Sequence, residues 1–188
     1  MKRRELVKMG VGLGVAGVVG STLSTADAAP CVTCDPDAMA KSAVKHFIPG
    51  KLTCGEAVLL AGLESLGLKT KLAPDIALGL GGGVGLQGNT CGVVTSAAMI
   101  LGLAVGAVEK DYKKKKMATF KAVGKFSKAF EKEFGCTGCR KLSGLDLTTV
   151  EGRKKFMASV KSERCSKLVA FGAKMLAASL QELAREYA

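Results

Sequence analysis

Residues 91–108 form an eighteen-residue segment without a charged side chain. A membrane-spanning helix needs about 20 predominantly apolar residues, so this segment lies at the lower limit for a span. Its glycine, alanine and serine residues would let neighbouring helices pack closely against it, and the sequences on both sides are typical of a soluble domain. We therefore predict a buried central helix here and no transmembrane span in the mature chain.

The rest of the sequence also shows helical patterns. Thr53 and Glu56 have the spacing of a capping box, and Thr148 and Glu151 repeat it further along. No segment alternates apolar and polar residues with the period of a strand. The sequence predicts an all-α fold, a compact multi-helix single domain with a Gly-rich loop. The predicted helices cover residues 37–47, 53–66, 73–79, 91–108, 110–134 and 150–187, with a short helix after a turn at 136–142.

The N-terminus has the order of an export signal. Arg3 and Arg4 precede a short, weakly apolar stretch at residues 9–20, and Ala26-Asp27-Ala28 has the small-residue pattern of a cleavage site. The arginine pair resembles a twin-arginine signal, which exports folded proteins, usually with a cofactor inserted; an ordinary secretory signal is the alternative. We predict a signal peptide at 1–28, a mature leader at 29–39, a helical domain at 40–188 and a periplasmic location.

The chain is strongly basic, and this charge bears on its partners. Removal of residues 1–28 takes away four positive and two negative charges, so the formal net charge falls from +12 to +10. A basic surface suits nucleic acid, an anionic membrane or an acidic protein. The export signal and the scarcity of aromatic residues argue against nucleic acid. We expect an acidic redox partner protein, and leave a homodimer open.

Seven glycines occupy the fourteen positions from Gly79 to Gly92. So many residues without a Cβ indicate unusual backbone angles or a backbone that lies very close to something. Gly83, Gly85 and Gly88 match the dinucleotide-binding fingerprint, but a predicted helix precedes them where that motif needs a strand. The loop also lacks the Gly-Lys-Ser/Thr ending of a phosphate-binding loop. We expect it to lie against a bound group instead.

The seven cysteines cannot all pair with one another. Cys54 and Cys91 fall in the first turns of predicted helices, the latter after Asn89 or Thr90 as N-cap, and Cys139 follows Thr137, a candidate cap. The free N–H groups and positive dipole end of a helix start favour a thiolate. Cys165 lies on an inward-facing stripe and could complete the set. Sulfurs from four separate elements suit a buried cluster better than a linear zinc knuckle.

The other cysteines leave alternatives open. Cys31 and Cys34 form an exposed disulfide or are inert leader residues, and Cys136 pairs with Cys139, replaces it or is a spare thiol. Covalent c-type haem is not expected, because Asp35 stands where the attachment motif needs histidine. His46, the one histidine, is interpreted as an ordinary helical residue.

Four segments together carry a resemblance to a known family: residues 53–58, the glycine loop into 91–96, residues 139–147, and Cys165. They resemble the redox-active protein family C_GCAxxG_C_C over about residues 40–182. Carried over by position, the resemblance implies that the defining cysteines are Cys54, Cys91, Cys139 and Cys165. It implies an all-helical redox protein that holds an iron–sulfur cluster. Val93 and Ser96 depart from the family motif, which bears on packing more than on the ligand set.

These observations predict an exported redox or electron-transfer protein with an iron–sulfur cluster on the four cysteines. Gly82, Gly83 and Gly92 are the predicted backbone contacts to the cluster, since N–H groups bonded to its sulfurs tune the reduction potential. One alternative is an enzyme, a thiol–disulfide oxidoreductase that uses Cys136 and Cys139. Another is a structural protein with disulfides or a zinc site.

Overall fold

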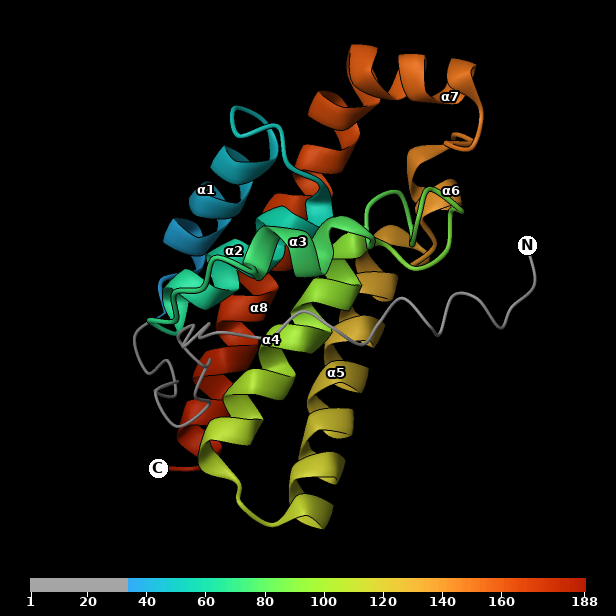
Figure 1. The fold of residues 1–188 in the computed structure, drawn as a ribbon. Coiled ribbons are helices and arrows are strands. Elements are labelled where there is room, and N and C mark those ends of the chain that lie inside the picture. Colours follow the sequence, from blue (N-terminus) through green and yellow to red (C-terminus); the bar gives the residue numbers. More distant parts are fainter. Residues whose placement is uncertain (1–33) are drawn as a thin grey trace, which may run out of the picture.

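The computed structural model describes residues 34–188, which fold into packed helices (Figure 1). This part of the chain contains no strand, only an isolated bridge between Thr90 and Gly138. The all-α prediction is therefore confirmed. The predicted export signal and residues 29–33 of the predicted leader lie outside the described residues. The elements are α1 (Pro36–Phe47), α2 (Cys54–Ser65), α3 (Ala73–Leu78), α4 (Gly92–Val108), α5 (Tyr112–Phe134), α6 (Cys139–Ser143), α7 (Val150–Lys155), the π-helix η2 (Phe156–Cys165) and α8 (Ser166–Glu186).

Helix α4 is the centre of this arrangement, as the uncharged segment predicts. It packs against α2, α5 and α8, and its core side chains, among them Ile100 and Leu101, are fully buried. Small residues on the partner helices make this approach close. A Cβ at Gly62 of α2 would stand 2.5 Å from Ile100, and one at Gly172 of α8 would overlap Val93. Among the described residues, no helix has both the length and the apolar character that crossing a membrane requires.

The predicted N-cap is confirmed at one helix and is wrong at three. At α2 the Thr53 hydroxyl accepts from the Glu56 N–H at 3.3 Å, and the Glu56 carboxylate accepts from the Thr53 N–H at 2.8 Å. At α7 the N-cap is Thr149, one residue later than predicted, and it bonds the Gly152 N–H. The predicted caps of α4 and α6 are also wrong, because Cys91 and Gly138 occupy those N-cap positions without a side-chain cap bond.

The predicted last helix, 150–187, is not one regular helix. Its first part, α7, turns across the end of the bundle before the chain descends through η2 into α8 (Figure 1). A π-helix closes its hydrogen bonds over five residues, so residues four or five apart share a face. Phe156, Lys161 and Cys165 are spaced in this way. With the period of an α-helix, Lys161 and Cys165 would still share a face, but Phe156 would point away from both.

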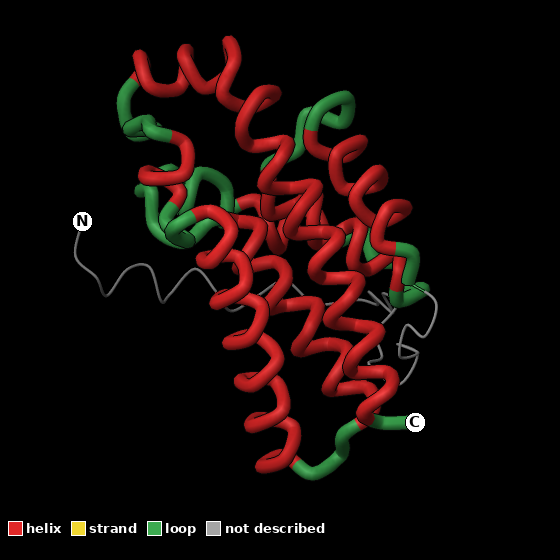
Figure 2. The backbone as a smooth tube through the Cα atoms, turned by 180° about the vertical axis from the view of Figure 1, so that it is seen from behind, coloured by secondary structure: helices red, strands yellow, loops and turns green. Residues whose placement is uncertain are grey.

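The glycine loop makes a left-handed turn. Gly82, Gly83, Val84, Gly85 and Leu86 have consecutive positive φ angles between 59° and 71°. Only glycine adopts this conformation without a steric cost, which confirms the expectation of unusual backbone angles. The loop is tied to the segment before α6, since the Cys139 N–H bonds the Asn89 carbonyl at 2.7 Å and the Cys91 N–H bonds the Thr137 carbonyl at 2.8 Å. The loop and α6 therefore lie side by side, as both views show (Figures 1 and 2).

Candidate functional site

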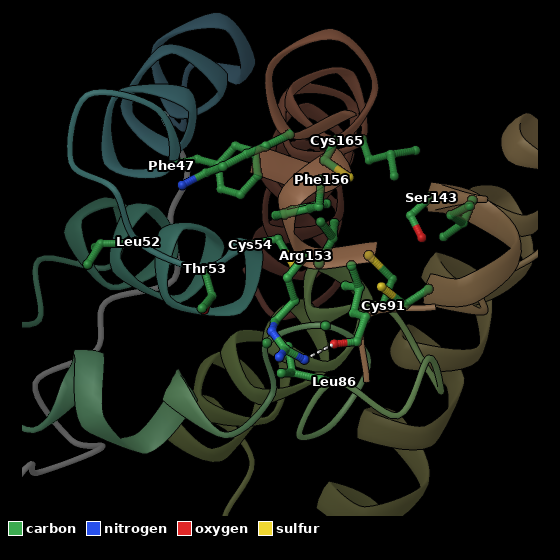
Figure 3. Close-up of a pocket in the computed structure, with 18 of the residues that line it drawn as sticks. Phe47, Leu52, Thr53, Cys54, Leu86, Cys91, Ser143, Arg153, Phe156 and Cys165 are labelled. Atoms are coloured by element: carbon green, nitrogen blue, oxygen red, sulfur yellow. Dashed lines mark hydrogen bonds between the residues drawn. The ribbon is translucent and has the colours of Figure 1, made fainter. Parts of the chain in front are cut away.

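A cavity of about 410 Å³ lies between the start of α2, the glycine loop, α6 and η2. All four cysteines that the family resemblance implies line it: Cys54, Cys91, Cys139 and Cys165. Figure 3 shows Cys54, Cys91 and Cys165 around the same central space, each on a different element. Four positions spread over more than a hundred residues of sequence thus meet at one place.

Cys54 is the most acidic thiol of this set. The pKa of its thiol is lowered mainly by a hydrogen bond from the Cys91 thiol, and also by backbone N–H groups of Gly92, Gly55 and Cys54 itself. Burial acts in the opposite direction. The free N–H groups at the start of α2 are the donors that a helix N-terminus offers to a negative charge. The lowered pKa of Cys54 therefore agrees in direction with the expectation that the start of its helix favours a thiolate.

Cys91 behaves in the opposite way. Its pKa lies well above the usual value, first because its thiol is hydrogen-bonded to Cys54, then because it is buried and faces the charge on Cys54. The two sulfurs are thus a hydrogen-bonded pair in which Cys54 is the more acidic partner. The expectation of a thiolate at Cys91 is wrong for the metal-free chain, because two adjacent buried negative charges repel each other.

Cys139 and Cys165 are also protonated without a metal. Burial raises the pKa of Cys139 to about 11 and that of Cys165 to about 12, and the charge on Cys54 adds to both shifts. Lys161 and Arg164 partly offset the shift at Cys165. The thiolate expected at Cys139 is wrong for the metal-free chain, since burial outweighs the effect of its short helix. A bound metal would reverse this, because thiol ligands lose their protons on coordination.

The three predicted glycines lie against these cysteines or the cavity wall. Gly92 lets the Cys54 sulfur approach the backbone, because a Cβ there would stand 2.7 Å from it. Gly83 lies against Cys139, whose Cβ would be 2.6 Å from an added Cβ. Gly82 lines the cavity beside Leu86 and Leu147. The loop therefore closely approaches the residues that the sequence assigned to the site.

The structure also places positive charges at the cavity, which the sequence analysis did not find. Lys51, Arg153 and Lys161 line it, and no aspartate or glutamate among residues 34–188 does. The Lys161 ammonium stands 4.9 Å from the centre of the Phe47 ring. One sequence signal could have found Lys161: it lies four residues before Cys165, a spacing that puts both on one face of a helix.

Cys136, Cys34 and His46 do not line the cavity. The Cys136 sulfur is 4.0 Å from the Gly138 carbonyl. Cys34 is disulfide-bonded but only 4% exposed, so the predicted exposed disulfide is buried at this end; Cys31 lies outside the described residues. His46 pairs with Glu64 at 2.8 Å on the outside of α1 and α2, away from the cavity.

The shape of the site bears on the kind of metal group it could hold. Within residues 34–188, no three His, Cys, Asp or Glu side chains gather tightly enough to bind one metal ion. A tetrahedral zinc ion would need its ligands within about 2.3 Å of a single point. Here four sulfurs border a cavity instead. Four cysteines are the usual ligand set of a cluster of several iron and sulfide atoms. The donor set that lines this cavity is therefore one that such a cluster takes.

The fold and the site define a helical protein with a buried, cysteine-lined cavity next to a glycine-rich turn. The family model described as "Putative redox-active protein (C_GCAxxG_C_C)" matches residues 52–179, so the chain belongs to this family. The resemblance noted from the sequence is confirmed, and the match contains the glycine loop and all four cysteines of the cavity. No curated protein and no solved structure matches the chain.

Proposed function

We propose that this member of a redox-active family is an exported electron-transfer protein that holds an iron–sulfur cluster on Cys54, Cys91, Cys139 and Cys165. The observation that carries the proposal is the meeting of these cysteines, from four elements, around one cavity. Thiolates from four cysteines are the common ligands of such clusters. The arginine pair and the weakly apolar stretch at the N-terminus support export to the periplasm with the cofactor already in place.

The cluster would supply one-electron transfer when bound. The chain's own residues would hold it and adjust its charge. The N–H groups that surround the Cys54 sulfur favour negative charge there, and Lys161 is close enough to Cys54 and Cys165 to act on both. The exposed lysines at the start of α5, Lys113, Lys114 and Lys116, offer a surface for an acidic partner.

Chemical analysis tests the proposal directly. The protein, produced in a host that assembles clusters and purified without oxygen, is expected to absorb visible light and to contain iron and sulfide in similar amounts. Zinc is measured in the same samples. A colourless, iron-free protein from such a host would overturn the proposal, and zinc in place of iron would favour the structural alternative.

Thiol–disulfide chemistry is the second candidate, but the structure favours a different pair from the one predicted. Cys136 lies outside the cavity, and the raised pKa of Cys139, about 11, does not suit a nucleophilic thiol. Cys54 and Cys91 are in hydrogen-bonding contact, and the pKa of Cys54 is lowered while that of Cys91 is raised. A thiolate beside a thiol is the arrangement from which a disulfide forms most readily.

We expect metal-free protein treated with diamide to form a Cys54–Cys91 disulfide first, because these sulfurs are already in contact. Two thiols are oxidised, and diamide takes up their two electrons and two protons. Peptide mapping by mass spectrometry identifies the bond. Cys136→Ser should leave it unchanged and Cys91→Ser should abolish it. First formation of a Cys136–Cys139 bond would support the originally predicted pair instead.

A further inference from the structure

The chemistry of the cavity wall points to a second ligand in addition to a metal group. Apart from the four cysteines, the wall is mainly apolar, and each of its charged residues is positive: Lys51, Arg153 and Lys161. A volume of about 410 Å³ lies within the range of small-molecule sites, which are largely apolar with a few polar groups that orient the ligand. An apolar wall with cations and no carboxylate is complementary to an apolar molecule that carries a negative charge.

Arg153 is held in place to recognise such a charge. Its Nη1 donates to the backbone carbonyls of Leu147 at 2.9 Å and Thr148 at 2.8 Å, which fixes the side chain. Figure 3 shows its guanidinium beside Leu86 at the cavity, with the bond to Leu147 dashed. The described residues provide no carboxylate partner for it and no acceptor for its Nε or Nη2. A guanidinium with free N–H groups is suited to bind a carboxylate through two hydrogen bonds.

The opening of the cavity is apolar. Leu78, Leu86 and Met157 line the cavity and are also exposed, with relative exposures of 57%, 37% and 65%. These side chains come from α3, the left-handed turn and η2, and they lie where a ligand would enter. Leu86 has a positive φ angle, so the strained turn itself places an apolar side chain at the opening.

We propose that this cavity binds a small monocarboxylic acid with an apolar body. Its carboxylate would pair with Arg153, and its apolar part would lie against Leu86, Leu147 and Met157. Lys161 would stay beside the cysteine sulfurs and would not pair with the carboxylate. This role goes beyond electron transfer, and it depends on Arg153 and the apolar opening rather than on a bound cluster. A small acid bound in this cavity would lie beside the cysteines and would change the charge around their sulfurs.

Calorimetric titration tests the proposal, with octanoate as the probe and octan-1-ol as a neutral probe of equal chain length. The full protein, as purified without oxygen, is expected to bind one octanoate at least about tenfold more tightly than octan-1-ol, which is the scale of a charge-assisted bond. Arg153→Gln should remove this preference. Lys121→Gln, at a surface pair with Glu186, is the control and should keep it.

Arg153 also bonds the backbone before α7, so its replacement affects folding as well as ligand binding. A second pair of variants tests ligand binding without this effect. Met157 is exposed, so Met157→Glu and Met157→Lys should fold alike while placing opposite charges at the opening. Octanoate should bind more weakly to Met157→Glu than to Met157→Lys, whereas octan-1-ol should not distinguish them. Equal octanoate affinities for this pair, equal affinities of the two probes for the unmodified protein, or no binding at millimolar octanoate would each overturn the proposal.

Discussion

The Cys54→Ala protein is expected to be purified without colour and with little iron. The pKa of the Cys54 thiol is lowered by Cys91 and by N–H groups at the start of α2, so its loss removes the most acidic sulfur ligand of the site. Loss of groups that only orient a ligand weakens metal binding by about 10- to 100-fold, and loss of the ligand itself should exceed that. Visible absorption and iron per protein chain measure the effect.

Cys136→Ala is the matched control for this prediction. Cys136 lies three residues from Cys139, belongs to the same loop and is partly buried, yet it does not line the cavity. Its replacement should leave colour and iron content unchanged. Loss of colour in Cys136→Ala with retention in Cys54→Ala would show that the assignment of ligands is wrong.

The second large effect is expected from Gly83→Ala. Gly83 has a φ angle of 71°, and a Cβ there would stand 2.5 Å from the Asn89 carbonyl oxygen and 2.6 Å from the Cys139 Cβ. The substitution therefore combines left-handed strain with overlap against backbone that cannot easily move. We expect the free energy of unfolding of the metal-free protein to fall by about 3 kcal/mol or more, as measured by urea denaturation.

Gly85→Ala separates the two causes. Gly85 has a similar φ angle, 59°, but an added Cβ would meet no atom within 4 Å. Only the left-handed strain should remain, at a cost of about 1–2 kcal/mol. Gly83→Ala should also displace Cys139 and weaken metal binding, whereas Gly85→Ala should not. Equal losses in both variants would mean that the approach of the loop to Cys139 contributes nothing to stability.

Features governed by near neighbours in the chain were predictable. The capping box at Thr53 and Glu56 forms because both bonds are made within four residues. The uncharged segment becomes the buried helix α4 because burial removes its apolar side chains from water. The family assignment and the four cysteines also followed from sequence, since the motif at each position is local.

Other features depended on contacts between distant segments. The pKa of Cys54 is lowered and that of Cys91 is raised mainly because the two thiols are hydrogen-bonded to each other. No spacing along the chain indicates this contact. The start of α6 was predicted with the wrong cap, because the Thr137 and Asn89 carbonyls are bonded across the loop rather than locally. Burial then outweighed the helix-start effect at Cys139.

By itself the sequence determined the helical class, the buried α4, the family and the cysteines of the site, because periodicity and motifs are properties of short segments. Only the tertiary structure decided that these cysteines line one cavity and that Cys136 does not. It alone decided that η2 winds as a π-helix, which brings Phe156 onto the face of Lys161 and Cys165, and that Arg153 stands at an apolar opening. These features depend on how segments pack across the whole fold, where the free energy of many contacts outweighs local preference.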